Sequence, residues 1–105
     1  MKSKVLFMAC LVVSATFSLQ AKSQAVDANL GRNLSANCAN CHGTNGASVG
    51  GIAALAGQPK DSLVRMLKEF REGKRPATIM HQLSKGYSDE QIELIAAYLS
   101  TQKTK

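Results

Sequence analysis

The sequence has 105 residues, a formal net charge of +6 and 45% hydrophobic residues. This length allows a single domain. The basic residues are scattered singly along the chain without interleaved aromatic residues, which excludes the basic, aromatic-rich surface of a nucleic-acid-binding protein. Tryptophan is absent, and Phe70, Tyr87 and Tyr98 are the only aromatic residues after position 25. We therefore expect a bound apolar group to supply much of the core.

Residues 1–25 have the pattern of a secretory signal peptide. Residues 1–4 carry two lysines and no acid, residues 5–17 are almost wholly apolar, and small residues follow up to Ala21 and Ala25. Cleavage is expected after Ala21 or Ala25. The later cut removes three of the 13 basic residues and none of the 7 acids, so the net charge falls to +3.

A transmembrane anchor is the alternative interpretation of this apolar stretch, but a membrane span needs about 20 apolar residues and the stretch is shorter. Cys10 lies inside it and is expected to leave with the signal. The mature domain, residues 26–105, is therefore expected in the periplasm without a stable membrane anchor.

The first helix is predicted over residues 27–37. Asp27 is the expected N-cap, and Leu30 and Leu34 repeat at the i, i+4 spacing of one helix face. Residues 43–57 contain five glycines, too many for regular structure, and this stretch predicts a loop.

A second helix is predicted from an N-cap at Asp61 or Ser62 to Glu72, with Gly73 ending it. Residues 74–87, which contain a proline and a glycine, are predicted to form a second loop. The apolar stripe of the helix consists of Leu63, Met66, Leu67 and Phe70.

The last helix has the clearest start signal in the chain. The run Ser88-Asp89-Glu90-Gln91 is typical of a capping box with acids in the first helical turn. No segment shows the alternation of a strand, so the sequence predicts an all-α domain with three main helices. The apolar face of the last helix consists of Ile92, Ile95, Ala96 and Leu99.

The run Cys38-Ala39-Asn40-Cys41-His42 matches the Cys-x-x-Cys-His pattern of covalent haem attachment. A three-residue spacing on a helical turn puts both thiols on one face, within reach of the two vinyl groups at one porphyrin edge. The histidine that follows is then held beneath the iron as the proximal ligand. We therefore predict one covalently bound haem c.

Other interpretations of the two cysteines agree less well with the sequence. A redox-active Cys-x-x-Cys normally belongs to a βαβ pattern, which this sequence lacks. A zinc site needs two further Cys or His ligands, and His81 is the only other histidine. A simple disulfide between Cys38 and Cys41 would close a very short loop and constrain the chain little.

An electron-transfer haem usually takes a second axial ligand, and Met66, Met80 and His81 are the candidates after position 25. Met66 fits the apolar stripe of the middle helix and is better explained as a core residue. Met80 lies in a predicted loop that can be shaped around the iron, and thioether ligation raises the reduction potential. We favour Met80, with His81 as the main alternative, which would give a lower potential.

These residues resemble the class I cytochromes c of bacteria, over residues 27–102. The motifs that carry the resemblance are Gly31, CANCHG at residues 38–43, LAGQ at residues 55–58 and FREG at residues 70–73. Within the class, the chain is most similar to the cytochrome subunit of flavocytochrome c sulfide dehydrogenase, and cytochrome c4 domains share the pattern less closely. The segments most similar to that subunit are FREGKR at residues 70–75, TIM at residues 78–80 and KGYSDEQ at residues 85–91.

The resemblance implies the small class I cytochrome c fold, with loops wrapped around one covalent haem. It also implies thioether bonds at Cys38 and Cys41, with His42 and Met80 as the axial ligands of the iron. The protein would then transfer single electrons without being an enzyme itself.

The resemblance further implies that Gly31 permits a close crossing of the first and last helices, with Tyr98 or Leu99 nearby. The family commonly places a proline two residues before the leucine of its Leu-x-Gly motif, and the carbonyl of that proline orients the proximal histidine. This sequence has Ala53 there. A carbonyl is still available, so ligation is expected to be kept while the loop is less stiff.

The expected partner is a flavoprotein subunit that oxidises sulfide, and the alternative is a free soluble carrier that serves other oxidases or reductases. An open iron site for catalysis or gas sensing is a third hypothesis, which requires that Met80 does not bind the iron. Four cations in segments expected around the site could steer a partner, or could simply be solvated surface residues. They are Lys60, Lys74, Arg75 and Lys85.

Overall fold

A computed structural model describes residues 29–105 as a set of helices joined by loops. The elements are α1 (Leu30–His42), the 3-10 helix η1 (Thr44–Gly46), α2 (Lys60–Arg71), α3 (Met80–Ser84) and α4 (Asp89–Ser100). The described part of the chain contains no strand, which confirms the all-α prediction. None of its helices is both long enough and apolar enough to cross a membrane. The predicted signal, residues 1–25, lies outside the described residues.

Helix α1 is longer at its C-terminal end than the sequence pattern suggested. It has Asn29 at the N-cap position and continues five residues beyond position 37, to His42. The predicted cap, Asp27, lies outside the described residues. The helix ends where Gly43 takes a φ of +82°, a conformation that glycine adopts without steric cost. The Cys-x-x-Cys-His motif therefore forms the last turns of a continuous helix.

The start of α2 was predicted wrongly, and its end correctly. Neither Asp61 nor Ser62 is the N-cap, because the extended backbone of Pro59 takes that position. The Pro59 carbonyl accepts hydrogen bonds from the N–H groups of Ser62 and Leu63, at 3.0 and 3.1 Å. A proline fixes φ near −65° and therefore starts a helix well, without a capping side chain. The helix ends before Gly73, as expected.

The stretch predicted as a continuous loop, residues 74–87, contains the short helix α3. Pro76 and Gly86 lie outside this helix, so neither interrupts its backbone hydrogen bonds. The Ile79 carbonyl accepts hydrogen bonds from the N–H groups of Gln82 and Leu83 and thereby starts the helix. Residues 29–105 thus form four α-helices where three were predicted.

Helix α4 begins as predicted. The Ser88 hydroxyl accepts a hydrogen bond from the Gln91 N–H at 3.2 Å, and the Gln91 side chain accepts one from the Ser88 N–H at 3.0 Å. This capping box satisfies two backbone donors that the helix itself leaves unpaired. All four residues of the predicted apolar face are buried: Ile92, Ile95, Ala96 and Leu99.

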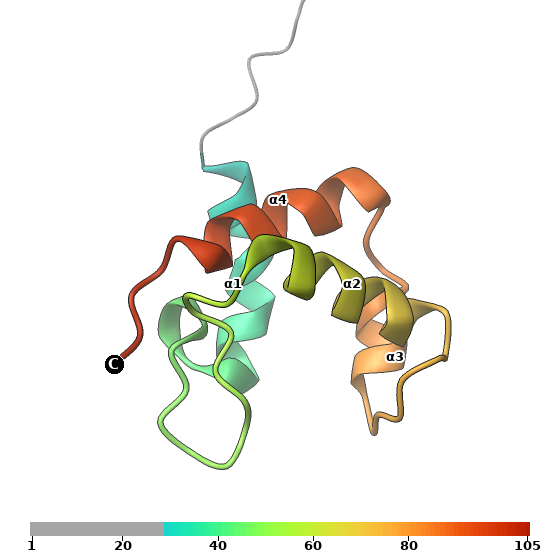
Figure 1. The fold of residues 1–105 in the computed structure, drawn as a ribbon, viewed down its shortest axis with the longest axis horizontal. Coiled ribbons are helices and arrows are strands. Elements are labelled where there is room, and N and C mark those ends of the chain that lie inside the picture. The colour runs from blue at the N-terminus through green and yellow to red at the C-terminus, as the bar shows by residue number, and fades with distance from the viewer. Residues whose placement is uncertain (1–28) are drawn as a thin grey trace, which may run out of the picture.

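The core lies where α4 meets α1 and α2. Leu63 of α2 packs with Ile95, Ala96 and Leu99 of α4, and Met66 is among the partly buried side chains around them. Figure 1 shows α1 crossing α4, α2 lying along α4, and α3 beneath the C-terminal end of α2. In the same view, the C-terminal end of α1, the loop after it and α3 all extend from one side of α2.

The predicted close crossing of α1 and α4 is confirmed at Gly31. A Cβ atom added to Gly31 would lie 2.7 Å from the Leu94 carbonyl oxygen and 3.3 Å from the Tyr98 Cβ. Only a residue without a side chain allows α4 to approach α1 so closely. The crossing fixes the helix that carries the cysteine motif against the last helix of the chain.

Candidate functional site

The cysteine motif occupies the C-terminal turns of α1. Cys38 is half-buried and Cys41 is exposed, and the two thiols are free rather than joined in a disulfide. Cys38 packs against the hydrophobic core, and its burial raises the pKa of the thiol above the ordinary value. Because residues three apart on a helix share a face, both thiols can react along one side of α1.

His42, the last residue of α1, is oriented by the loop that follows it. The His42 Nδ1 and the Ala53 carbonyl oxygen lie 2.6 Å apart and form a hydrogen bond. A carbonyl can only accept, so Nδ1 carries the proton and Nε2 keeps a free lone pair. This arrangement is typical of a histidine that binds a metal through its other nitrogen. The expectation that Ala53 supplies the carbonyl in place of a proline is confirmed.

Gly46 holds the loop segment that contains Ala53. Its carbonyl oxygen accepts two hydrogen bonds, from the Leu55 N–H at 2.7 Å and the Ala56 N–H at 3.1 Å. Ala56 is buried and Leu55 packs against the core. These contacts fix the backbone two residues after Ala53, so they also fix the carbonyl that meets the His42 ring.

Helix α4 anchors the same loop at two further points. The Tyr98 hydroxyl donates a hydrogen bond to Asn45 Oδ1 at 2.6 Å, and the Gly57 N–H donates one to the Leu99 carbonyl at 3.0 Å. Asn45 has a φ of +55°, in the left-handed region that asparagine tolerates better than most residues. The Tyr98–Asn45 pair was not predicted. The dipeptide Asn45-Gly46 is a turn signal, but it does not say which side chain would bind there.

Met80 is the first residue of α3 and is half-buried. Its neighbours Ile79 and Leu83 are 54% and 50% exposed, so an apolar part of α3 has no cover among the described residues. Met66 instead packs against the hydrophobic core, as predicted. Met66 is thus among the side chains that pack against the core, and Met80 is not.

The other alternative ligand, His81, is half-buried next to Met80. Its Nδ1 atom and the Ser84 hydroxyl are buried without a hydrogen-bond partner among the described residues. Buried polar atoms normally have partners. These two atoms belong to residues one helical turn apart on α3. The described polypeptide therefore leaves two buried polar atoms beside this helix without hydrogen bonds.

The described residues fit a haem on two physical grounds. Val49 and Ile52 on the loop after α1, like Ile79 and Leu83 near Met80, are large apolar side chains left exposed. An apolar group that lies between these segments would cover such side chains, and porphyrin is a large apolar surface. His and Met are also the axial pair typical of electron-transfer haem. Both segments extend from the same side of α2 (Figure 1).

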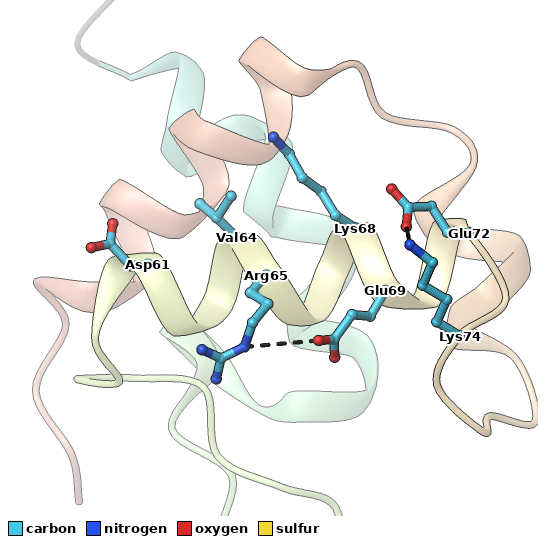
Figure 2. Close-up of a pocket in the computed structure, with 7 residues that line it drawn as sticks. All are labelled: Asp61, Val64, Arg65, Lys68, Glu69, Glu72 and Lys74. Atoms are coloured by element: carbon cyan, nitrogen blue, oxygen red, sulfur yellow. Dashed lines mark ion pairs between the residues drawn. The ribbon is translucent and has the colours of Figure 1, made fainter.

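A shallow hollow over α2 does not fit such a group. Figure 2 shows that charged side chains from α2 and the residues after it line this hollow, with Val64 as its apolar member. Lys74 lies against Glu72 at 2.7 Å and Arg65 against Glu69 at 3.8 Å. The hollow is a solvated, ion-paired surface.

Of the two interpretations of the four cations, ion pairs favour solvated surface residues over a patch that steers a partner. Lys60 pairs with Glu93 at 2.8 Å, and Lys74 and Arg75 pair with the carboxylates of Glu72 and Glu69. The pairing raises the pKa of Lys60 and of Lys74, and it lowers the pKa of Glu72. Three of the four cations are thus matched by nearby negative charge, and the surface is mixed rather than basic.

The comparisons with known proteins agree with this geometry. The family model for cytochrome c matches residues 28–103. The cytochrome subunit of sulfide dehydrogenase from Chlorobaculum tepidum is 39% identical over 75 residues, which cover 71% of this chain and 68% of that protein. Cytochrome c-554(548) from Halomonas halodenitrificans is 39% identical over 81 residues, which cover 73% of this chain and 98% of that protein.

A solved structure of cytochrome c4 from Acidithiobacillus ferrooxidans is also similar, with a TM-score of 0.59 and 38% identity. The match covers 61% of this chain and 37% of that one. The helices, the cysteine motif and the matched relatives agree on one small haem-binding fold. The chain belongs to the cytochrome c family, with the class I fold, and is an electron-transfer protein that carries covalently bound haem c.

Proposed function

We propose that Cys38 and Cys41 hold the haem through thioether bonds and that His42 and Met80 are the axial ligands of its iron. The observation that carries this proposal is the 2.6 Å hydrogen bond between His42 Nδ1 and the Ala53 carbonyl. It fixes the tautomer and turns Nε2 into the free ligand atom, directly after the two cysteines. No other described histidine has such a carbonyl partner.

The chain's own residues prepare the site for outer-sphere electron transfer. When bound, the haem supplies a one-electron couple between Fe(III) and Fe(II). His42 keeps one orientation because Ala53 is held by the loop that α4 anchors. Bound through its thioether, Met80 would favour the reduced iron. The exposed apolar side chains of Ile79 and Leu83 next to it would be available to cover an apolar group.

The ligand assignment is tested by absorption spectroscopy of the ferric, haem-loaded protein. Ligation by a methionine sulfur gives a weak absorption in the red. Replacing Met80→Ala should abolish this absorption, and Met66→Leu and His81→Ala should keep it. Persistence of the absorption in Met80→Ala would show that another sulfur ligates the iron.

The cysteine assignment needs a separate measurement. In a host competent for cytochrome maturation, the wild-type chain should keep its haem after denaturation and organic extraction. Cys41→Ala should retain it through one bond only, and the double substitution at Cys38 and Cys41 should lose it. A wild-type protein that releases its haem on extraction would contradict the assignment.

We also infer that the electron donor is a sulfide-oxidising flavoprotein subunit. The proposal is supported by the identity of 39% to the sulfide dehydrogenase cytochrome subunit, and by the resemblance of the segments within residues 70–91 to that kind of subunit. A stoichiometric flavoprotein should copurify with the tagged cytochrome under native conditions. Sulfide added to that complex should reduce the haem.

A free-standing carrier is the second candidate function. It is favoured by the match to cytochrome c-554(548), because this chain aligns with 98% of that protein and leaves little of it unmatched. A cytochrome that purifies alone under native conditions, and that is not reduced by sulfide in the cell extract, would favour the free carrier over the subunit.

We propose a periplasmic location, supported by the signal-like pattern of residues 1–25. Mass spectrometry of the exported, haem-loaded protein tests both location and processing. The mature N-terminus should be Lys22 or Val26. An intact N-terminus on protein recovered from the cytoplasm would refute the proposal.

A further inference from the structure

The segment that carries Met80, residues 74–87, has little structure of its own. Its only helix, α3, is five residues long, and isolated helices of that length are not stable in water. The segment leaves α2 at its C-terminal end and leads into α4, and α3 packs against α2 (Figure 1). Whatever holds the segment on α2 therefore also holds Met80.

Arg75 holds the beginning of this segment. Its Nε and Nη2 atoms donate hydrogen bonds to one oxygen of Glu69, at 2.9 and 2.7 Å. Its guanidinium also lies 5.6 Å from the centroid of the Phe70 ring, within the range of a cation–π contact. Both partners belong to α2, so Arg75 folds the chain back onto the helix that it has just left.

Arg71 holds the end of the segment. Its Nη1 donates to the Tyr87 carbonyl at 3.2 Å, and its Nη2 donates to Asp89 Oδ1 at 2.5 Å. Lys68 lies 3.6 Å from the other oxygen of Asp89. The two cations lower the pKa of Asp89, which stays ionised and able to accept. Arg71 thus joins α2 to the place where the segment ends and α4 begins.

We propose that Arg71 and Arg75 are positioning residues that keep Met80 on the haem iron by clamping both ends of residues 74–87 to α2. The inference rests on the proposed ligation by Met80. An incoming ligand can replace the methionine only when the segment moves away from the iron. The clamps lower the population of that open state, and they thereby weaken the apparent affinity of any competing ligand.

Imidazole binding to the ferric, haem-loaded protein tests the proposal. Arg71→Gln and Arg75→Gln should each tighten the apparent imidazole affinity by about three- to tenfold, since each loses charge-assisted hydrogen bonds. A tenfold change corresponds to about 1.4 kcal/mol. Arg65→Gln is the matched control, because Arg65 pairs with Glu69 on the same helix and has no hydrogen bond or ion pair to residues 74–87 of the described chain. It should change the affinity less than twofold.

Two further measurements separate positioning from general stability. Arg71→Lys keeps the charge but lacks the planar guanidinium that donates hydrogen bonds to both Tyr87 and Asp89. It should therefore give an imidazole affinity between those of the wild type and Arg71→Gln. In the wild-type protein, added salt should tighten imidazole binding, and the double variant should lose most of this dependence. These readouts remain available if one glutamine variant fails to load haem.

The outcomes distinguish the clamp from the ligand assignment on which it rests. If Met80→Ala binds imidazole tightly and lacks the red absorption, while both arginine variants match Arg65→Gln, then the clamp is refuted and the ligand assignment stands. If Met80→Ala keeps the red absorption and the wild-type affinity, the ligand assignment fails and the clamp fails with it.

Discussion

Gly31 lies where α1 crosses α4, and replacing it with alanine would place a methyl group against the backbone of α4. The new Cβ would lie 2.7 Å from the Leu94 carbonyl oxygen, and a backbone atom cannot turn away as a side chain can. Overpacking of this kind costs about 1–3 kcal/mol, and the rigid neighbour favours the upper part of that range. Alanine regains about 1 kcal/mol through its higher helix propensity. The net loss is about 1–2 kcal/mol.

For a domain of this size, such a loss lowers the melting temperature by about 5–15 °C. Thermal unfolding of the haem-loaded protein, followed by far-ultraviolet circular dichroism, measures it. Asn33→Ala, at an exposed position of α1, isolates the propensity gain, and Gly50→Ala adds a methyl group in open space. A Gly31→Ala protein that melts at or above the wild-type temperature would show that the helices can separate without cost.

Three other changes test contacts elsewhere in the fold. Ser88→Ala removes half of the capping box and should lower the free energy of unfolding by about 1 kcal/mol in urea titrations. Tyr98→Phe should cost about 0.5–1.5 kcal/mol through the lost bond to Asn45, while Tyr87→Phe, whose hydroxyl makes no hydrogen bond to a described residue, should cost less. Asp89 has a lowered pKa, so its contribution should be full above about pH 4 and disappear as the pH falls through the folded value. The difference in stability between the wild type and Asp89→Asn should therefore shrink in acid, and a difference that grows there would contradict this sign.

Local signals predicted the elements that depend on few neighbours. The start of α4 is an example, because the capping box is contained in four consecutive residues, Ser88 to Gln91. The cysteine motif was recognisable for a similar reason, whereas the role of Gly31 was implied by the resemblance to class I cytochromes c. At each of these positions, only particular residue types meet the chemical or steric requirement.

The predictions from the sequence failed where contacts between residues far apart in the chain determine the structure. Helix α1 continues through its weak helix formers to His42 because Leu34 and Cys38 pack against the core, which local propensity does not register. Helix α3 forms within a predicted loop because it packs against α2. The roles of Arg71 and Arg75 depend on partners up to 18 residues away and could not be read from spacing.

The close contact at Gly31 also constrains the order in which the chain can fold. The partners of Gly31, Leu94 and Tyr98, follow it by 63 and 67 residues in the sequence, so the crossing closes a loop of most of the domain. Long-range contacts of this kind form slowly. The two thiols of α1 therefore remain accessible to a maturation enzyme until α4 has docked. A chain cut before α4 would remain open to that chemistry but could not close the crossing afterwards.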